Sequence, residues 1–346
     1  MNRLSIIRPD DWHLHLRDSP YMESVVADSA RQFSRAIVMP NLDPPVRSCD
    51  EAFAYRDRIL SALDADSQFQ PLMTLYLTDN TSSEEIVRAS ASDFVFAAKL
   101  YPAGATTNSD AGVTDVANIH AVLETMQTHS FPLLVHGEAT GQAIDVFDLE
   151  KIFIEMTLNS IRSDFPELPI VFEHITTRDA VDYVESQDDR LMATITPHHL
   201  LINRNAMFTG GFHPHHYCLP VAKREEHRLA LLKAASGGSN CFFAGTDSAP
   251  HARHAKESAC GCAGIYSAHC AIELYAEAFE LAGDFTHFEA FMSLNGPAFY
   301  QLPVNSTRVR LERIEWKVPD TLPFAAEILV PFKAGEVLQW KVVTDD

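Results

Sequence analysis

The chain has 346 residues, of which 46% are hydrophobic and 21% charged, so it can bury a large core and is not a disordered segment. Its formal net charge of −20 excludes nucleic acid and anionic lipid as expected partners, because an acidic surface repels both. The six cysteines are too irregular for a disulfide framework, the N-terminus has no apolar signal core, and no apolar run approaches the ~20 residues that span a bilayer, so we expect a cytoplasmic protein.

Short β-rich apolar runs alternate along the chain with longer stretches of helical periodicity. The predicted strands are residues 5–15, 35–39, 71–77, 94–100, 133–136, 170–174, 192–196 and 241–245. The clearest predicted helices are residues 22–33, 49–63, 113–127 and 223–235. Alternation of strand and helix predicts a parallel sheet, and eight such units predict an α/β fold closed into a (β/α)₈ TIM barrel.

The C-terminal segment, from about residue 304 to residue 346, has a different pattern. Two strand-like runs, 327–332 and 337–343, are joined by Lys333-Ala334-Gly335 and predict a short hairpin packed on the barrel. This extension is too short to form a sandwich of its own. We therefore expect a single domain that spans residues 1–346.

In a barrel of this kind the active site lies at the carboxyl ends of the strands. The polar residues that end the predicted strands are His13, His15, Lys99, His136, His174 and Asp247. His13 and His15 face the same side because side chains alternate along a strand. Imidazole and carboxylate groups together are the ligands that Zn²⁺ prefers. The sequence therefore predicts a zinc site at the barrel mouth.

Lys99 has a particular chemical explanation in this set. A lysine that closes an apolar strand is costly to bury unless it is paired or neutral. A neutral lysine amine can react with CO₂ to form a carbamate, an anion whose two oxygens can bridge two cations. A bridging ligand of this kind indicates a two-metal site.

Taken alone, each of these residues has an ordinary structural explanation. His136 and His174 could be satisfied core histidines, and Asp247 could cap the helix that follows it. The convergence of six such residues from five separated segments on one mouth favours the metal site.

The order His-x-His, Lys, His, His, Asp resembles the binuclear amidohydrolase superfamily. The segments DDWHLHLRD, AIVMPNL, AAKLYPAGATTNSDAGV, LLVHGE, FEHITT, ATITPHHL and GTDSAPHARHAKESACGCAG are similar to those of bacterial-type dihydroorotases. The similarity runs from Arg8 to about Pro303. It implies reversible cyclisation of N-carbamoyl-L-aspartate to L-dihydroorotate in pyrimidine biosynthesis.

The resemblance also implies roles for individual residues. Two Zn²⁺ ions per subunit would be bound by His13, His15, Lys99, His136, His174 and Asp247. Lys99 would bridge the two ions as a carbamate, and Asp247 would also shuttle protons. The implied substrate contacts are Arg17, Asn41, His136, Leu219, His251 and Ala263. Thr106 and Thr107 would form the tip of a mobile loop, and family members are often homodimers.

The residues themselves support one of these roles directly. Arg17 lies two positions past His15 and projects toward the same mouth, where a guanidinium can grip a carboxylate through parallel hydrogen bonds. Such local positive charge explains how an acidic protein attracts an anion. The alternative for Arg17 is a surface ion pair with Asp18 or Asp11, and for Asn41 it is turn chemistry in the surrounding loop.

Several alternatives stay open at this point. A hydantoinase-like cyclic-amide hydrolase would share the metals and lack the carboxylate contacts. A deaminase of this kind usually holds one metal, and a barrel kept only for assembly would lack a ligand. We assign no role to His199, expect Cys218 to be buried, expect His254 to face away from the site, and interpret the histidines of GGFHPHHYC and the Cys260-Gly261-Cys262 segment as loops.

Overall fold

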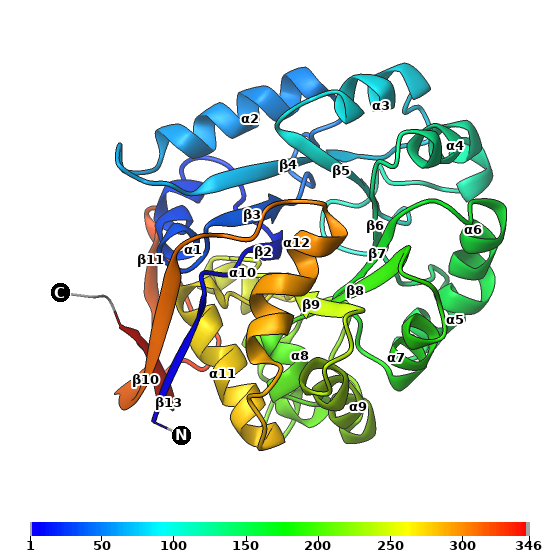
Figure 1. Ribbon diagram of the computed structural model, residues 1–346. Coiled ribbons are helices and arrows are strands. Elements are labelled where there is room, and N and C mark those ends of the chain that lie inside the picture. Colours follow the sequence, from blue (N-terminus) through cyan, green and yellow to red (C-terminus); the bar gives the residue numbers. More distant parts are fainter. Residues whose placement is uncertain (1, 344–346) are drawn as a thin grey trace.

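The computed structural model describes residues 2–343, so the predicted domain, 1–346, extends past the described residues at both ends (Figure 1). Its centre is an eight-stranded parallel sheet in which each strand pairs with the next along the chain. The strands are β2 (Asp11–Leu14), β3 (Arg35–Val38), β4 (Gln70–Tyr76), β5 (Val95–Leu100), β6 (Leu133–His136), β7 (Ile170–Glu173), β8 (Leu191–Ile195) and β9 (Phe242–Ala244).

The first and last strands of this sheet are joined just beyond their carboxyl ends. The backbone N–H of Asp247 donates to the carbonyl of His13 at 2.9 Å, and that of His15 donates to the carbonyl of Ser248 at 3.1 Å. These bonds close the sheet into a ring, and the predicted (β/α)₈ barrel is confirmed.

The first predicted strand, 5–15, is wrong as a single element. It divides into β1 (Arg3–Ile7), which lies outside the barrel, and β2, which lies inside it. Pro9 lies between them and has no backbone N–H to continue a strand ladder. An apolar run therefore does not by itself reveal that its two halves belong to different sheets.

Helices surround the barrel, and α12 lies across one of its ends (Figure 1). They are α1 (Val26–Gln32), α2 (Cys49–Ser61), α3 (Ser83–Ser90), α4 (His120–Thr128), α5 (Leu149–Phe153), α6 (Asn159–Asp164), α7 (Arg178–Glu185), α8 (Pro197–Leu201), α9 (Glu225–Ser236), α10 (Arg253–Lys256), α11 (Ala271–Ala282) and α12 (Asn295–Phe299). Helix α2 begins with a capping box, in which the Ser48 hydroxyl accepts from the Glu51 N–H and the Glu51 carboxylate accepts from the Ser48 N–H. None of the helices in residues 2–343 is both long and apolar enough to cross a bilayer.

Two apolar layers hold the barrel together. Outward-facing strand residues such as Ala36 and Val38 pack against the helices, whereas Ile37 points into the barrel with Leu134, as the period-two alternation requires. At the end opposite the active-site mouth, Trp12 stacks on Tyr300 with ring centroids 4.5 Å apart. This stacked pair fixes β2, which contains His13 and ends one residue before His15.

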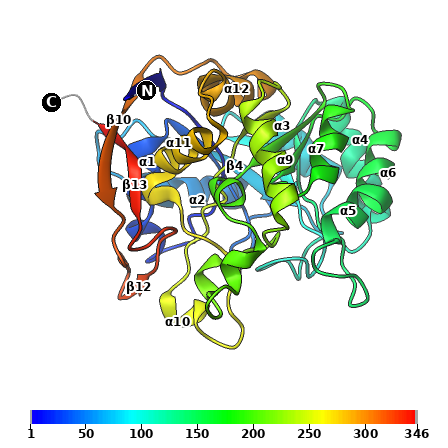
Figure 2. The same ribbon diagram turned by 90° about the horizontal axis from the view of Figure 1, so that it is seen from below.

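The C-terminal strands do not form the predicted hairpin. Strand β12 (Glu327–Leu329) pairs with β11 (Leu322–Phe324), and β13 (Val337–Val343) pairs with β10 (Arg308–Lys317). Strand β10 also pairs with β1, so both ends of the chain share one antiparallel sheet beside the barrel (Figures 1 and 2). Strand β13 contacts α11.

Candidate metal centre and substrate pocket

A pocket of about 340 Å³ opens at the carboxyl ends of the barrel strands. Its lining residues are His13, His15, Arg17, Asn41, Tyr101, Thr106, Thr107, His136, His174, Leu219, Asp247, Ala249, Ala263 and Gly264. Every predicted site residue except Lys99 and His251 is in this set, and those two lie against it. The structure therefore brings together residues from segments spread over most of the chain.

Three of the predicted metal ligands meet on one side of the pocket floor. The Nε2 atoms of His13 and His15 lie 3.2 Å apart, and Asp247 Oδ1 lies 3.3 and 3.0 Å from them. His15 is held from behind, because its Nδ1 lies 2.9 Å from Asn41 Oδ1. The contact between Asn41 and His15 replaces the simple turn role that the sequence left open.

The other predicted ligands lie on the opposite side of the floor. The His174 ring centroid is 4.9 Å from those of both His13 and His136. Lys99 is fully buried, and its Nζ lies 4.9 Å from the centre of the Tyr101 ring. His136 Nε2 contacts Glu138 Oε2 at 3.0 Å. All six predicted ligands therefore surround one small volume.

Glu173 is a member of this site that the sequence reasoning missed. Its carboxylate contacts Lys99 Nζ, and its Oε1 lies 3.0 Å from His13 Nδ1. Val171 faces the barrel interior, so the residue two positions later faces the same way. This alternation could have identified Glu173 from the sequence, but the sequence reasoning chose the neighbouring His174 as the strand-end residue. Tyr101, two positions after Lys99, could have been found in the same way.

The backbone turns sharply at three of the site residues. Arg17, His174 and Asp247 have φ values of 64°, 45° and 45°, in the left-handed region that residues other than glycine rarely adopt. At His174 this turn follows the last residue of β7 and brings the imidazole to the pocket beside Glu173. Such strain persists only where surrounding contacts impose it, and it is common at functional sites.

Burial determines the charge states of the floor. It lowers the pKa of His13 and His174 well below the usual histidine value, and the Lys99 amine adds to the effect at His13. Burial also lowers the pKa of Lys99 well below that of a free lysine. The floor therefore favours neutral imidazoles and a neutral amine, which are the forms that bind metals or react with CO₂.

Asp11 supports the floor from outside the pocket. Its carboxylate accepts from the Thr246 N–H at 2.8 Å, from the Thr246 hydroxyl at 2.6 Å and from the His13 N–H at 3.2 Å. It thereby ties β2 to the segment that leads into Asp247. Burial raises the pKa of Asp11 to about 7.

Arg17 and His251 lie side by side at one wall of the pocket, and Arg17 gives this wall its positive charge, because burial lowers the pKa of His251 well below the usual histidine value. Arg17 Nε donates to the Pro250 carbonyl at 3.0 Å, and its Nη2 lies 2.8 Å from His251 Nε2. That imidazole nitrogen also lies 2.9 Å from the Ala263 carbonyl. A ring nitrogen either donates or accepts, so His251 can serve one neighbour at a time. The alternative surface ion pair does not form, because Asp18 pairs with Arg58.

The predicted loop tip reaches over the pocket. Asn41 Nδ2 donates to the Thr107 carbonyl at 3.1 Å, and Asn108 Nδ2 donates to the Asn41 carbonyl at 2.9 Å. The Thr107 hydroxyl also lies 3.5 Å from the Ala263 carbonyl. These contacts join the loop to two other walls. The mobility of this loop stays a prediction.

Lys256 is a third residue that the sequence reasoning missed, after Glu173 and Tyr101. Its buried ammonium donates to the carbonyls of Tyr217, Cys262 and Gly264 at 2.6–2.7 Å, which ties the Leu219 segment to the Ala263 segment. No local pattern distinguishes this lysine from a surface one. His254 is largely exposed, as expected, and contacts Glu327 at 2.5 Å.

The donor set fits divalent metal ions on grounds that the structure itself provides. Nitrogen and oxygen donors of His13, His15 and Asp247 all lie within 4.8 Å of one another, as do those of His13, Glu173 and His174. His13 Nδ1 and Lys99 Nζ on the same floor contact the Glu173 carboxylate, whereas the buried Nδ1 of His174 has no hydrogen-bond partner within residues 2–343. Buried polar groups are normally satisfied, so the free imidazole nitrogen of His174 fits a metal ion as its partner.

Comparison with known proteins agrees with this chemistry. Residues 6–310 match the amidohydrolase family. A dihydroorotase of Cupriavidus metallidurans is 62% identical over 98% of both chains. The crystal structure of a Campylobacter jejuni dihydroorotase is similar with a TM-score of 0.91, at 37% identity over 99% of this chain and 98% of that one. A Saccharomyces cerevisiae dihydroorotase in complex with 5-fluoroorotic acid gives a TM-score of 0.91, at 31% identity over 99% of both chains.

Proposed function

Because the chain belongs to the amidohydrolase family and, within it, to the dihydroorotases, we propose that it interconverts N-carbamoyl-L-aspartate and L-dihydroorotate at a two-zinc centre. One observation carries this proposal. The metal-type donor set and a cationic wall that fits a carboxylate line the same pocket of about 340 Å³.

The two ions would be bound by His13, His15, Lys99, His136, His174 and Asp247. Lys99 would take part after its neutral amine adds CO₂ and releases one proton, which gives an N-carboxylated side chain. The buried amine is suited to this reaction because burial keeps it uncharged. When bound, two zinc ions would polarise the amide carbonyl of the ring and lower the pKa of water.

Arg17, Asn41 and His251 would bind the α-carboxylate of the substrate. Arg17 has N–H groups beyond the two that contact Pro250 and His251, and a guanidinium can hold a carboxylate with two parallel bonds. The yeast relative in complex with 5-fluoroorotic acid holds a pyrimidine ring that bears a carboxylate. The backbones of Leu219 and Ala263 line the remaining wall and would contact the ring.

Asp247 would move the proton of the reaction. Cyclisation forms a bond between the ureido nitrogen and the carbon of the side-chain carboxylate, and it releases water while consuming one proton. Asp247 would take the proton from that nitrogen and, in hydrolysis, return it to the departing ring nitrogen. Since cyclisation consumes a proton, low pH favours the ring and high pH favours the open form.

The loop at Thr106 and Thr107 would exclude water over the bound ring. A homodimer and a cytoplasmic location stay predictions from the sequence.

The test is an assay of dihydroorotate hydrolysis, followed through the ultraviolet absorbance of the ring, before chelation, after chelation and after the return of zinc. We expect activity that disappears with the chelator and returns with zinc. Hydantoin is the control substrate, because it is a cyclic amide that lacks the carboxylate of dihydroorotate. Equal turnover of hydantoin would favour the hydantoinase-like alternative, and zinc-loaded protein without activity on dihydroorotate would contradict the assignment.

A further inference from the structure

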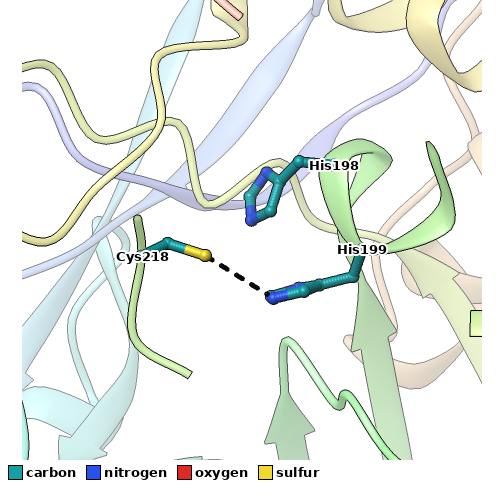
Figure 3. A group of neighbouring side chains, drawn as sticks. All are labelled: His198, His199 and Cys218. Atoms are coloured by element: carbon teal, nitrogen blue, oxygen red, sulfur yellow. Dashed lines mark hydrogen bonds between the residues drawn. The ribbon is translucent and has the colours of Figure 1, made fainter. Parts of the chain in front are cut away.

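A second group of histidines lies outside the pocket. His198 and His199 are in α8, directly after β8, and Cys218 comes from the loop that precedes α9. Figure 3 shows the three side chains converging from these two segments, with one ring nitrogen of His198 directed between the Cys218 sulfur and the His199 ring. All three residues are buried. None of them lines the substrate pocket.

The spacing of these groups suits a single ion. One ligand atom of each residue lies within 4.8 Å of those of the other two, and Cys218 Sγ is 3.7 Å from His199 Nε2. The Pro220 carbonyl oxygen lies 3.0 Å from the same nitrogen and 3.3 Å from the sulfur. Zinc bonds of ~2.0–2.3 Å in a tetrahedron place ligand atoms ~3.3–3.8 Å apart, close to these separations.

His198 is the member that most clearly lacks a partner. It is 0% exposed, and neither of its ring nitrogens has a hydrogen-bond partner within residues 2–343. A buried imidazole with two unsatisfied nitrogens is costly, because water no longer solvates either of them. A metal ion beside one nitrogen would remove part of that cost.

The other two members contact the Pro220 carbonyl, and an ion could bind between these groups. His199 Nε2 and the Cys218 thiol both approach the Pro220 carbonyl, while His199 Nδ1 lies 2.9 Å from the Thr196 hydroxyl. Binding would release the thiol proton and leave Nδ1 of His199 on Thr196. The bond to Thr196 would orient the ring, as a carbonyl or carboxylate does behind many metal-binding histidines.

The surroundings favour a structural ion rather than a reactive one. Phe332 lies edge-on to His198 with ring centroids 6.2 Å apart, and Cys218 belongs to an apolar cluster that includes Ile202 and Ile265. Burial holds His199 neutral with a pKa of about 4 and raises that of the Cys218 thiol, an effect that the nearby Lys256 and Lys223 oppose. Coordination by zinc deprotonates a thiol outright.

We propose that His198, His199 and Cys218, with the Pro220 carbonyl oxygen, bind a third divalent ion of the zinc class. This ion would fasten the Cys218–Pro220 segment to α8 and would thereby fix the wall that carries Leu219. It is distinct from the two-zinc centre, whose ligands offer nitrogen and oxygen only.

Sulfur coordination tests the proposal without any measurement of activity. X-ray absorption at the zinc edge of the holoenzyme, dialysed against metal-free buffer, should detect a sulfur neighbour at ~2.3 Å. Cys218→Ser should remove that neighbour and one bound zinc per chain. A double variant, Cys260→Ser with Cys262→Ser, is the matched control, because these thiols lie in a nearby loop outside the cluster. It should retain both the sulfur neighbour and the ion.

Two results would overturn the proposal. One is that the zinc of the wild-type protein has no sulfur neighbour. The other is that the zinc–sulfur signal is lost in the double variant but retained in Cys218→Ser.

If Cys218→Ser does not fold, the test uses His198→Gln instead, because this variant keeps the thiol and removes the unpartnered imidazole. It should lose the same zinc ion, and an unchanged zinc content would contradict the proposal. Failure of the proposed reaction would leave these outcomes unaffected.

Discussion

The two histidine clusters of this protein are built from similar side chains in opposite surroundings. The cluster at the barrel mouth combines His13, His15 and His174 with Asp247 and opens into a pocket. The cluster at α8 combines His198 and His199 with a thiol and is enclosed by apolar side chains. The contrast teaches that imidazoles alone do not define a reactive site. Access for a substrate, and a carboxylate that can carry a proton, make the difference.

The groups that contact the histidines from outside each cluster differ as well. Behind the first cluster lie the charged or amide groups of Glu173, Asp11 and Asn41, each from another element. Behind the second lies the Thr196 hydroxyl, next to His199 Nδ1. Carboxylates behind a histidine strengthen it as a ligand, so the first cluster is suited to bind and activate. The second is suited to hold a segment in place.

The largest expected effect is on kcat and comes from Asp247, because the cluster at α8 has no carboxylate that could carry a proton. Asp247→Asn should lower kcat by ~10²–10⁴-fold, the usual contribution of a positioned acid or base. The measurement is steady-state hydrolysis of dihydroorotate by variant protein with its zinc content determined. Turnover close to that of the wild type, with metals bound, would remove the proton-shuttle role and with it the main chemical contrast between the clusters.

The next largest expected effect is on KM and comes from Arg17 at the pocket wall. Arg17→Gln should raise KM for dihydroorotate by ~10- to 150-fold, since hydrogen bonds to a charged group contribute about 1.5–3 kcal/mol. Arg88→Gln is the control, because Arg88 lies on the surface in an ion pair with Asp50. A lower kcat at unchanged KM would contradict a role in binding the carboxylate.

Glu173 tests the support behind the first cluster. Glu173→Gln keeps the shape of the side chain but removes the charge beside His13 Nδ1 and Lys99 Nζ, and it should weaken metal affinity or activity by ~10–100-fold. Competition with a chelator of known zinc affinity measures the loss. Glu138→Gln, at the His136 side, is a useful comparison. Zinc affinity that does not change in Glu173→Gln would show that the contact is only structural.

The smallest effect concerns buried histidines without a proposed ion. Burial lowers the pKa of His269 to about 3. Between pH 6.5 and pH 3, His269 is therefore protonated in the unfolded chain but not in the folded chain. Stability from this residue is present above pH 6.5 and is lost as the pH falls, by about 1.4 kcal/mol per pH unit.

His269→Phe should therefore flatten the fall in the urea midpoint between pH 6.5 and pH 4. His198→Phe should act differently if a zinc ion holds that imidazole, because its main effect at pH 7 would be the loss of the ion. Identical pH profiles and zinc contents for the two variants would erase the distinction between a metal-binding histidine and an ordinary buried one.

The sequence by itself determined the barrel and most of its mouth. The strands are short, apolar and regularly spaced, and the side chain two positions after an inward-facing residue faces inward again. Lys99 follows Ala97 in this way, and His136 follows Leu134. Because parallel strands end at one rim, strand-end residues predicted from local pattern come together without further information about packing.

Only the tertiary structure decided the contacts between segments that follow no period. The C-terminal runs pair with β10 and β11 rather than with each other, because β1 and β10 together with β13 complete a sheet across the ends of the chain. His174 reaches the pocket because the chain turns at this residue, where φ is 45°. Lys256 and the cluster of His198, His199 and Cys218 depend on loops whose course is set by the packing around them. Such loops have no repeating geometry that a sequence could reveal, so their partners become visible only once the chain is folded.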